Sequence, residues 1–146
     1  TGETDFRQAG AQAVLAGEYA VMYAYGRGGA RLSEDRDTAL ALLEVHRTRR
    51  DQLRAWLTED GQEPLPPAPA YDVGQPVRGD ASARALLARV ELRLVPLYVE
   101  LIAESMNLQE RRNWAIRAVR DCAVTAQGWG AAGQAFPWPG GENPPI

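Results

Sequence analysis

The sequence predicts an all-α fold, a four-helix bundle with one long connection between its second and third helices. Apolar residues recur at intervals of three and four in four separate stretches, which is the pattern of helices with one buried face. A proline-rich stretch divides these helices into two pairs, because proline removes a backbone donor and interrupts helices. The length of 146 residues suits one core, so we expect a single domain over residues 1–146.

Glycine, proline and N-capping side chains set the expected ends of the helices. The glycine-rich residues 26–29 should stop the first helix, and the Ser33 hydroxyl should cap the start of the second. Pro96 falls inside the third helix and should bend it. We expect helices over residues 3–26, 33–59, 80–107 and 108–128, a connection over 60–79 and a coil tail over 129–146.

The connection is long enough to choose a topology. Residues 60–79 contain five prolines, and about 20 extended residues reach roughly 60 Å, whereas a helix of about 26 residues is only about 39 Å long. A connection that returns along the bundle makes the second and third helices parallel, which is the ferritin-like arrangement. The alternative is an up-down-up-down bundle with this segment packed elsewhere.

Composition argues against several classes of function. The net charge is −3 and acidic side chains are interspersed with the arginines, so we expect no nucleic-acid partner. No apolar run is long enough to cross a membrane and no signal peptide is visible, so we expect a soluble, cytoplasmic protein without a membrane partner. A leader removed before Thr1 is left open. The single cysteine, Cys122, cannot form an internal disulfide, which fits a reducing compartment.

Three ionisable side chains lie on faces that should be buried. Glu18, His46 and Glu91 each fall on the apolar stripe near the middle of a different predicted helix, so they should meet inside the bundle. Buried charge is unfavourable unless it is paired or bound to metal. One interpretation is a salt-bridge network in which Arg49 and Arg50 neutralise the carboxylates. The other is a metal site formed by Glu18, His46 and Glu91.

The number of ligands favours the salt-bridge network. A ferritin-like di-iron site uses one Glu from each of two helices and a Glu-x-x-His pair from each of the other two. The chain has one histidine, and Leu43 stands where the Glu of its pair should be. The fourth helix offers no carboxylate on its apolar face, so at most three of six ligands remain and we expect a degenerate metal site.

Short motifs along the chain carry a family resemblance. They are Ala16-Gly17-Glu18-Tyr19, Tyr23-Ala24-Tyr25-Gly26, His46-Arg47-Thr48-Arg49-Arg50-Asp51, Pro69-Ala70-Tyr71, Glu91 and Phe136-Pro137. With these motifs the sequence resembles the ferritin-like domains of unknown function that are common in actinobacteria. The resemblance covers nearly the whole chain and implies a ferritin-like four-helix fold, without an established activity.

Three functions stay open at this point. The first is a non-catalytic ferritin-like module that binds a partner or self-associates as a homodimer through an outer helix face. The second is a metal-dependent oxidoreductase with one iron or manganese ion on Glu18, His46 and Glu91. The third is a small-molecule or small-anion binding protein that uses Arg49 and Arg50. The missing ligands favour the first, so we expect no catalytic residues and no cofactor.

Overall fold

The computed structural model describes residues 2–74 and 76–131, and these residues form four helices without any strand. The helices are α1 (Gly2–Gly29), α2 (Arg36–Glu59), α3 (Asp80–Glu104) and α4 (Gln109–Gly128). The predicted all-α four-helix fold is therefore confirmed. Residues 132–146 of the predicted coil tail, including the Phe136-Pro137 motif, lie outside the described residues.

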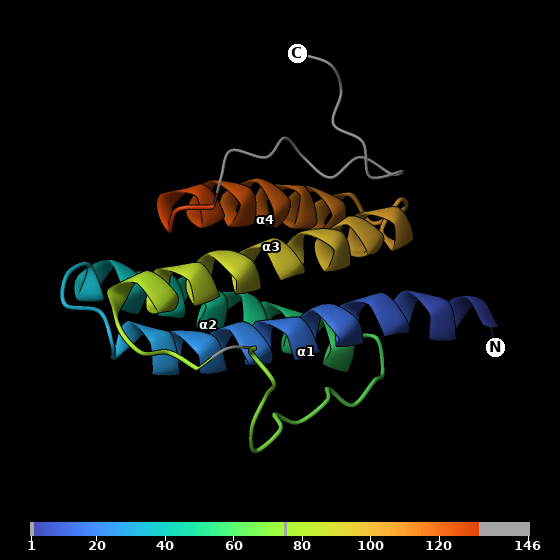
Figure 1. Cartoon of the computed structure of the whole chain (residues 1–146). Coiled ribbons are helices and arrows are strands. Elements are labelled where there is room, and N and C mark those ends of the chain that lie inside the picture. The colour runs from blue at the N-terminus through green and yellow to red at the C-terminus, as the bar shows by residue number, and fades with distance from the viewer. Residues whose placement is uncertain (1, 75, 132–146) are drawn as a thin grey trace, which may run out of the picture.

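The second and third helices are parallel (Figure 1), so the bundle does not have the up-down-up-down topology. Tyr25 of α1 contacts Glu91 of α3, while Glu18, earlier in α1, contacts Tyr98, later in α3, so these two helices are antiparallel. Figure 1 shows α2 and α3 running in the same direction, with α1 and α4 running in the opposite one. The connection over residues 60–79 therefore returns along the bundle from the end of α2 to the start of α3.

Hydrogen bonds from the helices hold this connection against α1. The Gln12 side chain donates to the Glu63 carbonyl at 2.8 Å and accepts from the Leu65 amide at 2.9 Å. The Tyr19 hydroxyl donates to the Leu65 carbonyl at 3.1 Å. These bonds satisfy backbone groups that have no helical or sheet partner, so the connection follows a defined course.

Three predicted helix ends were wrong because tertiary contacts override the local signals. The first helix runs on to Gly29, and the buried Gly28 faces Leu87 so closely that a Cβ there would lie 3.3 Å from its side chain. The second helix begins at Arg36, because Ser33 does not act as its N-cap. The Ser33 amide instead donates to the Asp80 carboxylate at 2.8 Å, at the start of α3.

The third helix ends at Glu104 rather than at residue 107, and a short turn leads into α4. The Ser105 amide closes this turn by donating to the Ile102 carbonyl at 3.1 Å. α3 continues through Pro96, which lies on its exposed side. A proline there lacks its own helical hydrogen bond but leaves the buried face of α3 intact.

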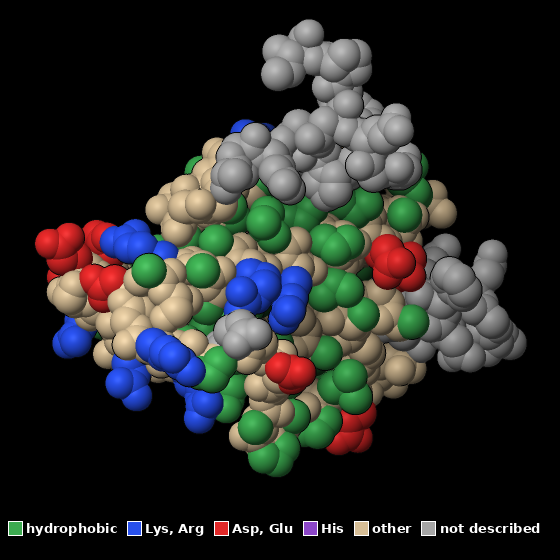
Figure 2. All heavy atoms as spheres, viewed as in Figure 1, with side chains coloured by type: hydrophobic (Ala, Val, Ile, Leu, Met, Phe, Trp, Pro, Cys, Tyr) green, Lys and Arg blue, Asp and Glu red, His purple; other side chains and the backbone are tan. Residues whose placement is uncertain are grey.

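All four helices contribute to one hydrophobic core. Trp129, directly after α4, belongs to it and is only 5% exposed. The face shown in Figure 2 carries both basic and acidic side chains among apolar ones. None of the described helices has the length and apolar character needed to cross a membrane. Four ionisable side chains, Glu18, His46, Arg49 and Glu91, are also buried inside the bundle.

Candidate functional site

The structure brings Glu18, His46 and Glu91 together inside the bundle. Each comes from the inward face of a different helix, α1, α2 and α3 respectively. Their exposed fractions are 0%, 1% and 1%, so all three are removed from bulk water. Because an unpaired buried charge is strongly destabilising, the arrangement of their polar atoms decides what this cluster can do.

His46 bridges the two glutamates. Its Nδ1 lies 2.6 Å from Oε2 of Glu18, and its Nε2 lies 2.7 Å from Oε1 of Glu91. An imidazole ring can donate from both nitrogens only when it is protonated. Two carboxylate acceptors on opposite edges of the ring therefore favour the imidazolium form.

The pKa of His46 agrees with this assignment. Burial by itself would lower the pKa, but the charge of Glu18 and the hydrogen bonds to Glu18 and Glu91 outweigh burial and raise it to about 9. His46 is therefore a cation at neutral pH. His46, which the sequence offered as a metal ligand, is therefore the main counter-charge of the two glutamates.

Two tyrosines complete the cluster in a crossed pattern. The Tyr25 hydroxyl of α1 donates to Oε1 of Glu91 at 2.6 Å, and the Tyr98 hydroxyl of α3 donates to Oε1 of Glu18 at 2.5 Å. Trp129 Nε1 donates to the Tyr25 hydroxyl at 2.9 Å. Burial first, and then the neighbouring carboxylate, raises the pKa of each tyrosine hydroxyl, so both remain protonated donors.

Sequence reasoning missed this crossed pairing, although a signal was present. Each tyrosine follows the glutamate of its own helix by seven residues, in Glu18 to Tyr25 and in Glu91 to Tyr98. Seven residues are two helical turns, so the pair lies on one face. When two such helices run antiparallel, each tyrosine is opposite the glutamate of the other helix.

Arg49 is the second cation beside the cluster. It is 8% exposed, and its Nη1 lies 4.0 Å from Oε1 of Glu18 and donates to Sγ of Cys122 at 3.4 Å. Its Nη2 lies 3.6 Å from the Asp121 carboxylate. Arg49 therefore links the cluster to α4 through electrostatic attraction and does not form a direct hydrogen bond to a buried glutamate.

Arg50 does not join the cluster, and the prediction that placed it there was wrong. Its Nε donates to the neighbouring Asp51 carboxylate at 2.9 Å, and its side chain is 28% exposed. Arg49 and Arg50 lie one turn after His46 on α2, and their side chains point to opposite sides of it. Arg49 points toward α4, where it contacts Cys122 and Asp121.

One oxygen of the cluster is left without a partner. Oε2 of Glu91 is buried and accepts no hydrogen bond from the described residues, although Oε1 of the same carboxylate accepts from both His46 and Tyr25. The Cys122 thiol is near this carboxylate, and burial, the charge of Glu91 and a hydrogen bond to Glu91 raise the pKa of the thiol. A neutral thiol is a weak donor, so it compensates the carboxylate only in part.

The cluster does not present its donors to a common point. Among the described residues, no group of three or more His, Cys, Asp or Glu side chains is arranged to hold a metal ion. Glu18 and Glu91 occupy opposite edges of the His46 ring, and each takes one ring nitrogen. A metal ion on Glu18, His46 and Glu91 would first have to displace one of these hydrogen bonds.

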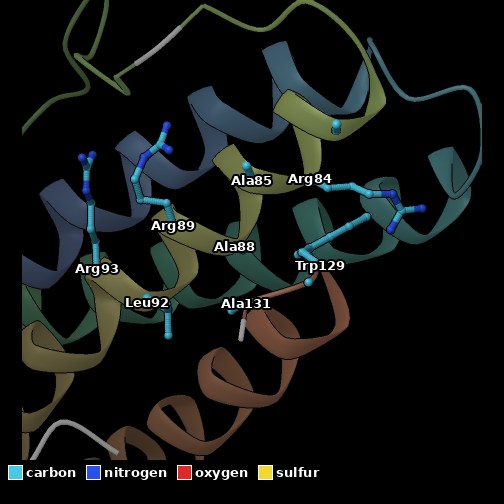
Figure 3. Close-up of a pocket in the computed structure, with 10 residues that line it drawn as sticks. Arg84, Ala85, Ala88, Arg89, Leu92, Arg93, Trp129 and Ala131 are labelled. Atoms are coloured by element: carbon cyan, nitrogen blue, oxygen red, sulfur yellow. The ribbon is translucent and has the colours of Figure 1, made fainter. Parts of the chain in front are cut away.

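A groove lies on the outer side of α3, away from the buried cluster. It has a volume of about 650 Å³ and reaches from Arg84 to Arg93, with Trp129 at one wall. Figure 3 shows Arg89 and Arg93 pointing the same way, while Arg84 extends past Trp129, 5.5 Å from its ring centroid. Arg89 donates to the Val73 carbonyl at 2.9 Å. Among the described residues, the groove therefore offers an apolar floor with partly engaged arginines and no carboxylate or histidine.

Known proteins share both the sequence pattern and the fold. A family model described as Domain of unknown function (DUF4439) matches residues 10–143. A conserved hypothetical protein from Mycobacterium tuberculosis is 25% identical, with a TM-score of 0.83 over 92% of this chain and 99% of that chain. A ferritin-like, diiron-carboxylate protein from Bacillus anthracis strain Ames is 15% identical, with a TM-score of 0.76 over 88% and 96%. The fold is thus ferritin-like. No curated protein matches the sequence.

Proposed function

Since the chain belongs to the DUF4439 family and has a ferritin-like fold, we propose that it is a non-catalytic binding module whose buried ion-pair cluster replaces a di-iron centre. The observation that supports this most is the bridging position of His46, which gives one ring nitrogen to each buried glutamate. A ferritin-like di-iron site instead needs two Glu-x-x-His pairs with nitrogens available to metal.

Charge balance inside the bundle supports the same proposal. The carboxylates of Glu18 and Glu91 face two cations, His46 and Arg49. Tyr25 and Tyr98 add charge-assisted hydrogen bonds, which are stronger than bonds between neutral groups. The cluster is therefore compensated by the chain's own residues.

Metal analysis tests the proposal directly. Protein purified without chelators should contain no stoichiometric iron or manganese, and its melting temperature should be the same with added Mn²⁺, added Fe²⁺ or EDTA. Stoichiometric metal that disappears in His46→Ala would instead support the metal-dependent oxidoreductase on Glu18, His46 and Glu91. Exposed Glu44 gives a control variant, Glu44→Ala, that should leave metal content unchanged.

The proposal also includes a cytoplasmic location and self-association as a homodimer. The location is supported by the single cysteine, which is buried and free. Self-association is supported by exposed apolar side chains on outer helix faces, among them Leu40 and Val99. Light scattering coupled to size-exclusion chromatography should give twice the mass of one chain, and Val99→Lys should reduce that mass.

A further inference from the structure

Close backbone contacts join α1 to α2, α1 to α3 and α3 to α4, but in the described part of the chain none joins α2 to α4. These two helices meet through side chains instead, as in Arg49 with Asp121 and Trp56 with Trp114. A pocket of about 230 Å³ lies between the side chains of α2 and α4, and its mouth is called the α2–α4 opening. One water takes only about 30 Å³ in the liquid, so the pocket has room for a small organic molecule.

The floor of this pocket includes the unpartnered carboxylate. Glu91 lines the pocket together with His46, although its side chain is only 1% exposed. In the part of the chain that the structure describes, its Oε2 has no hydrogen-bond partner, whereas both oxygens of Glu18 have one. A buried carboxylate oxygen without a donor is strongly unfavourable. A ligand that donates a hydrogen bond to this oxygen from the pocket would therefore be stabilised there.

The charges around the pocket favour a cation. Inside the bundle His46 and Arg49 balance Glu18 and Glu91, and Asp121, which is 68% exposed beside the pocket, adds a third carboxylate. The balance is one negative charge. An anion at the floor would meet the buried Glu91 carboxylate, and both ring nitrogens of the neighbouring His46 are already engaged by the two glutamates.

The walls of the pocket are apolar. Leu42 and Val45 of α2 face Val124 of α4 across the opening. Val45 and Val124 are 42% and 68% exposed, so both border the mouth of the pocket. Such walls can cover a short hydrocarbon chain but cannot satisfy polar groups along its length.

We propose that the α2–α4 pocket binds a short aliphatic primary amine, with its ammonium group on Glu91 Oε2 and its hydrocarbon chain between Val45 and Val124. This deepens the proposed binding function and rests on it, because a metal ion in the cluster would occupy the same carboxylate. A pocket smaller than a typical drug site of about 300 Å³ or more limits the ligand to a few carbons.

Isothermal titration calorimetry with n-butylamine in an amine-free phosphate buffer at pH 7 tests the ligand class. Saturable binding of one n-butylamine per chain is expected. n-Butanol, which has the same chain without the charge, should bind more weakly by a factor of about ten or more, and butyrate should not bind. Absence of saturable n-butylamine binding, or equal or tighter binding of butyrate, would overturn the proposal.

Two exposed aliphatic side chains of α4 provide matched variants that do not touch the buried charges. Val124→Trp should fill the mouth of the pocket and weaken n-butylamine by a factor of about ten or more. Ile116→Trp, at an exposed position of the same helix outside the pocket, should leave binding unchanged. If both variants bind n-butylamine as the wild type does, the amine binds elsewhere and the proposal is wrong.

Metal analysis of the same preparation separates the two proposals. Stoichiometric iron or manganese would contradict the ion-pair module itself. Metal-free protein that fails to bind n-butylamine would leave the module in place and overturn only the ligand class.

Discussion

Glu18 and Glu91 occupy equivalent positions on α1 and α3, yet they differ in how many of their carboxylate oxygens receive a hydrogen bond. Glu18 has a donor on each oxygen, from His46 and from Tyr98. On the side facing the α2–α4 opening, Glu91 receives both of its donors on one oxygen and keeps the other unpartnered. Glu18, with both oxygens paired, stabilises the bundle, whereas Glu91 keeps one oxygen for the ligand that we propose for the neighbouring pocket.

Removing the charge of Glu18 should have the largest effect. Glu18→Gln keeps the volume but takes the counter-charge from His46, so we expect the free energy of unfolding to fall by about 3–5 kcal/mol. Urea denaturation at pH 7 measures this, and EDTA should not change the result.

The control for that variant is Glu44→Gln, because Glu44 is 65% exposed and pairs with Arg47 on the surface of α2. It should lower the free energy of unfolding by about 0.5 kcal/mol or less. A Glu18→Gln protein that is more stable than the wild type in EDTA would indicate relief of carboxylate repulsion, as in an empty metal site.

Titration of His46 should produce the next largest effect. The folded-state pKa of about 9 lies above the ordinary value of 6.5, so the stabilisation is fully present below pH 6.5 and is lost as the pH rises through 9. About 3 kcal/mol of unfolding free energy should disappear across this interval. Urea denaturation at a series of pH values gives the slope.

His46 is the only histidine in the sequence, so the slope from pH 6.5 to about 8.5 can be assigned to it. The Cys122 thiol, whose ordinary pKa of 9.0 is raised by burial, adds to the loss of stability only near the top of the interval. The variant His46→Gln cannot titrate and should show a nearly flat dependence over the same interval, at lower overall stability. A wild-type protein whose stability does not change between pH 6.5 and 9 would contradict the imidazolium bridge.

Local patterns predicted the helices and the meeting of the three inward residues, because periodicity and mid-helix position depend on nearby sequence. Ser33 shows where this reasoning ends, since its partner Asp80 lies 47 positions away and no local signal reports it. The crossed tyrosines were also accessible only after α1 and α3 were known to be antiparallel.

The choice between Arg49 and Arg50 depended on the position of α4 in the same way. Arg49 and Arg50 follow His46 by three and four residues, so both lie one turn further along α2 and their side chains point to opposite sides of the His46 side chain. The fold then places Cys122 and Asp121 on the side of Arg49 and solvent on the side of Arg50.

Replacing each arginine separately should therefore give the smallest but most selective effect. Arg49→Ala removes the second cation and its buried stem, and should lower the free energy of unfolding by about 2 kcal/mol, whereas Arg50→Ala should lower it by well under about 1 kcal/mol. The two variants should also differ in the NMR titration of His46. Loss of a nearby positive charge favours the imidazolium, so the pKa of His46 should rise above about 9 in Arg49→Ala and remain unchanged in Arg50→Ala. Equal changes in both variants would mean that Arg49 does not interact with the cluster, and the balance of charge would then rest on His46 alone.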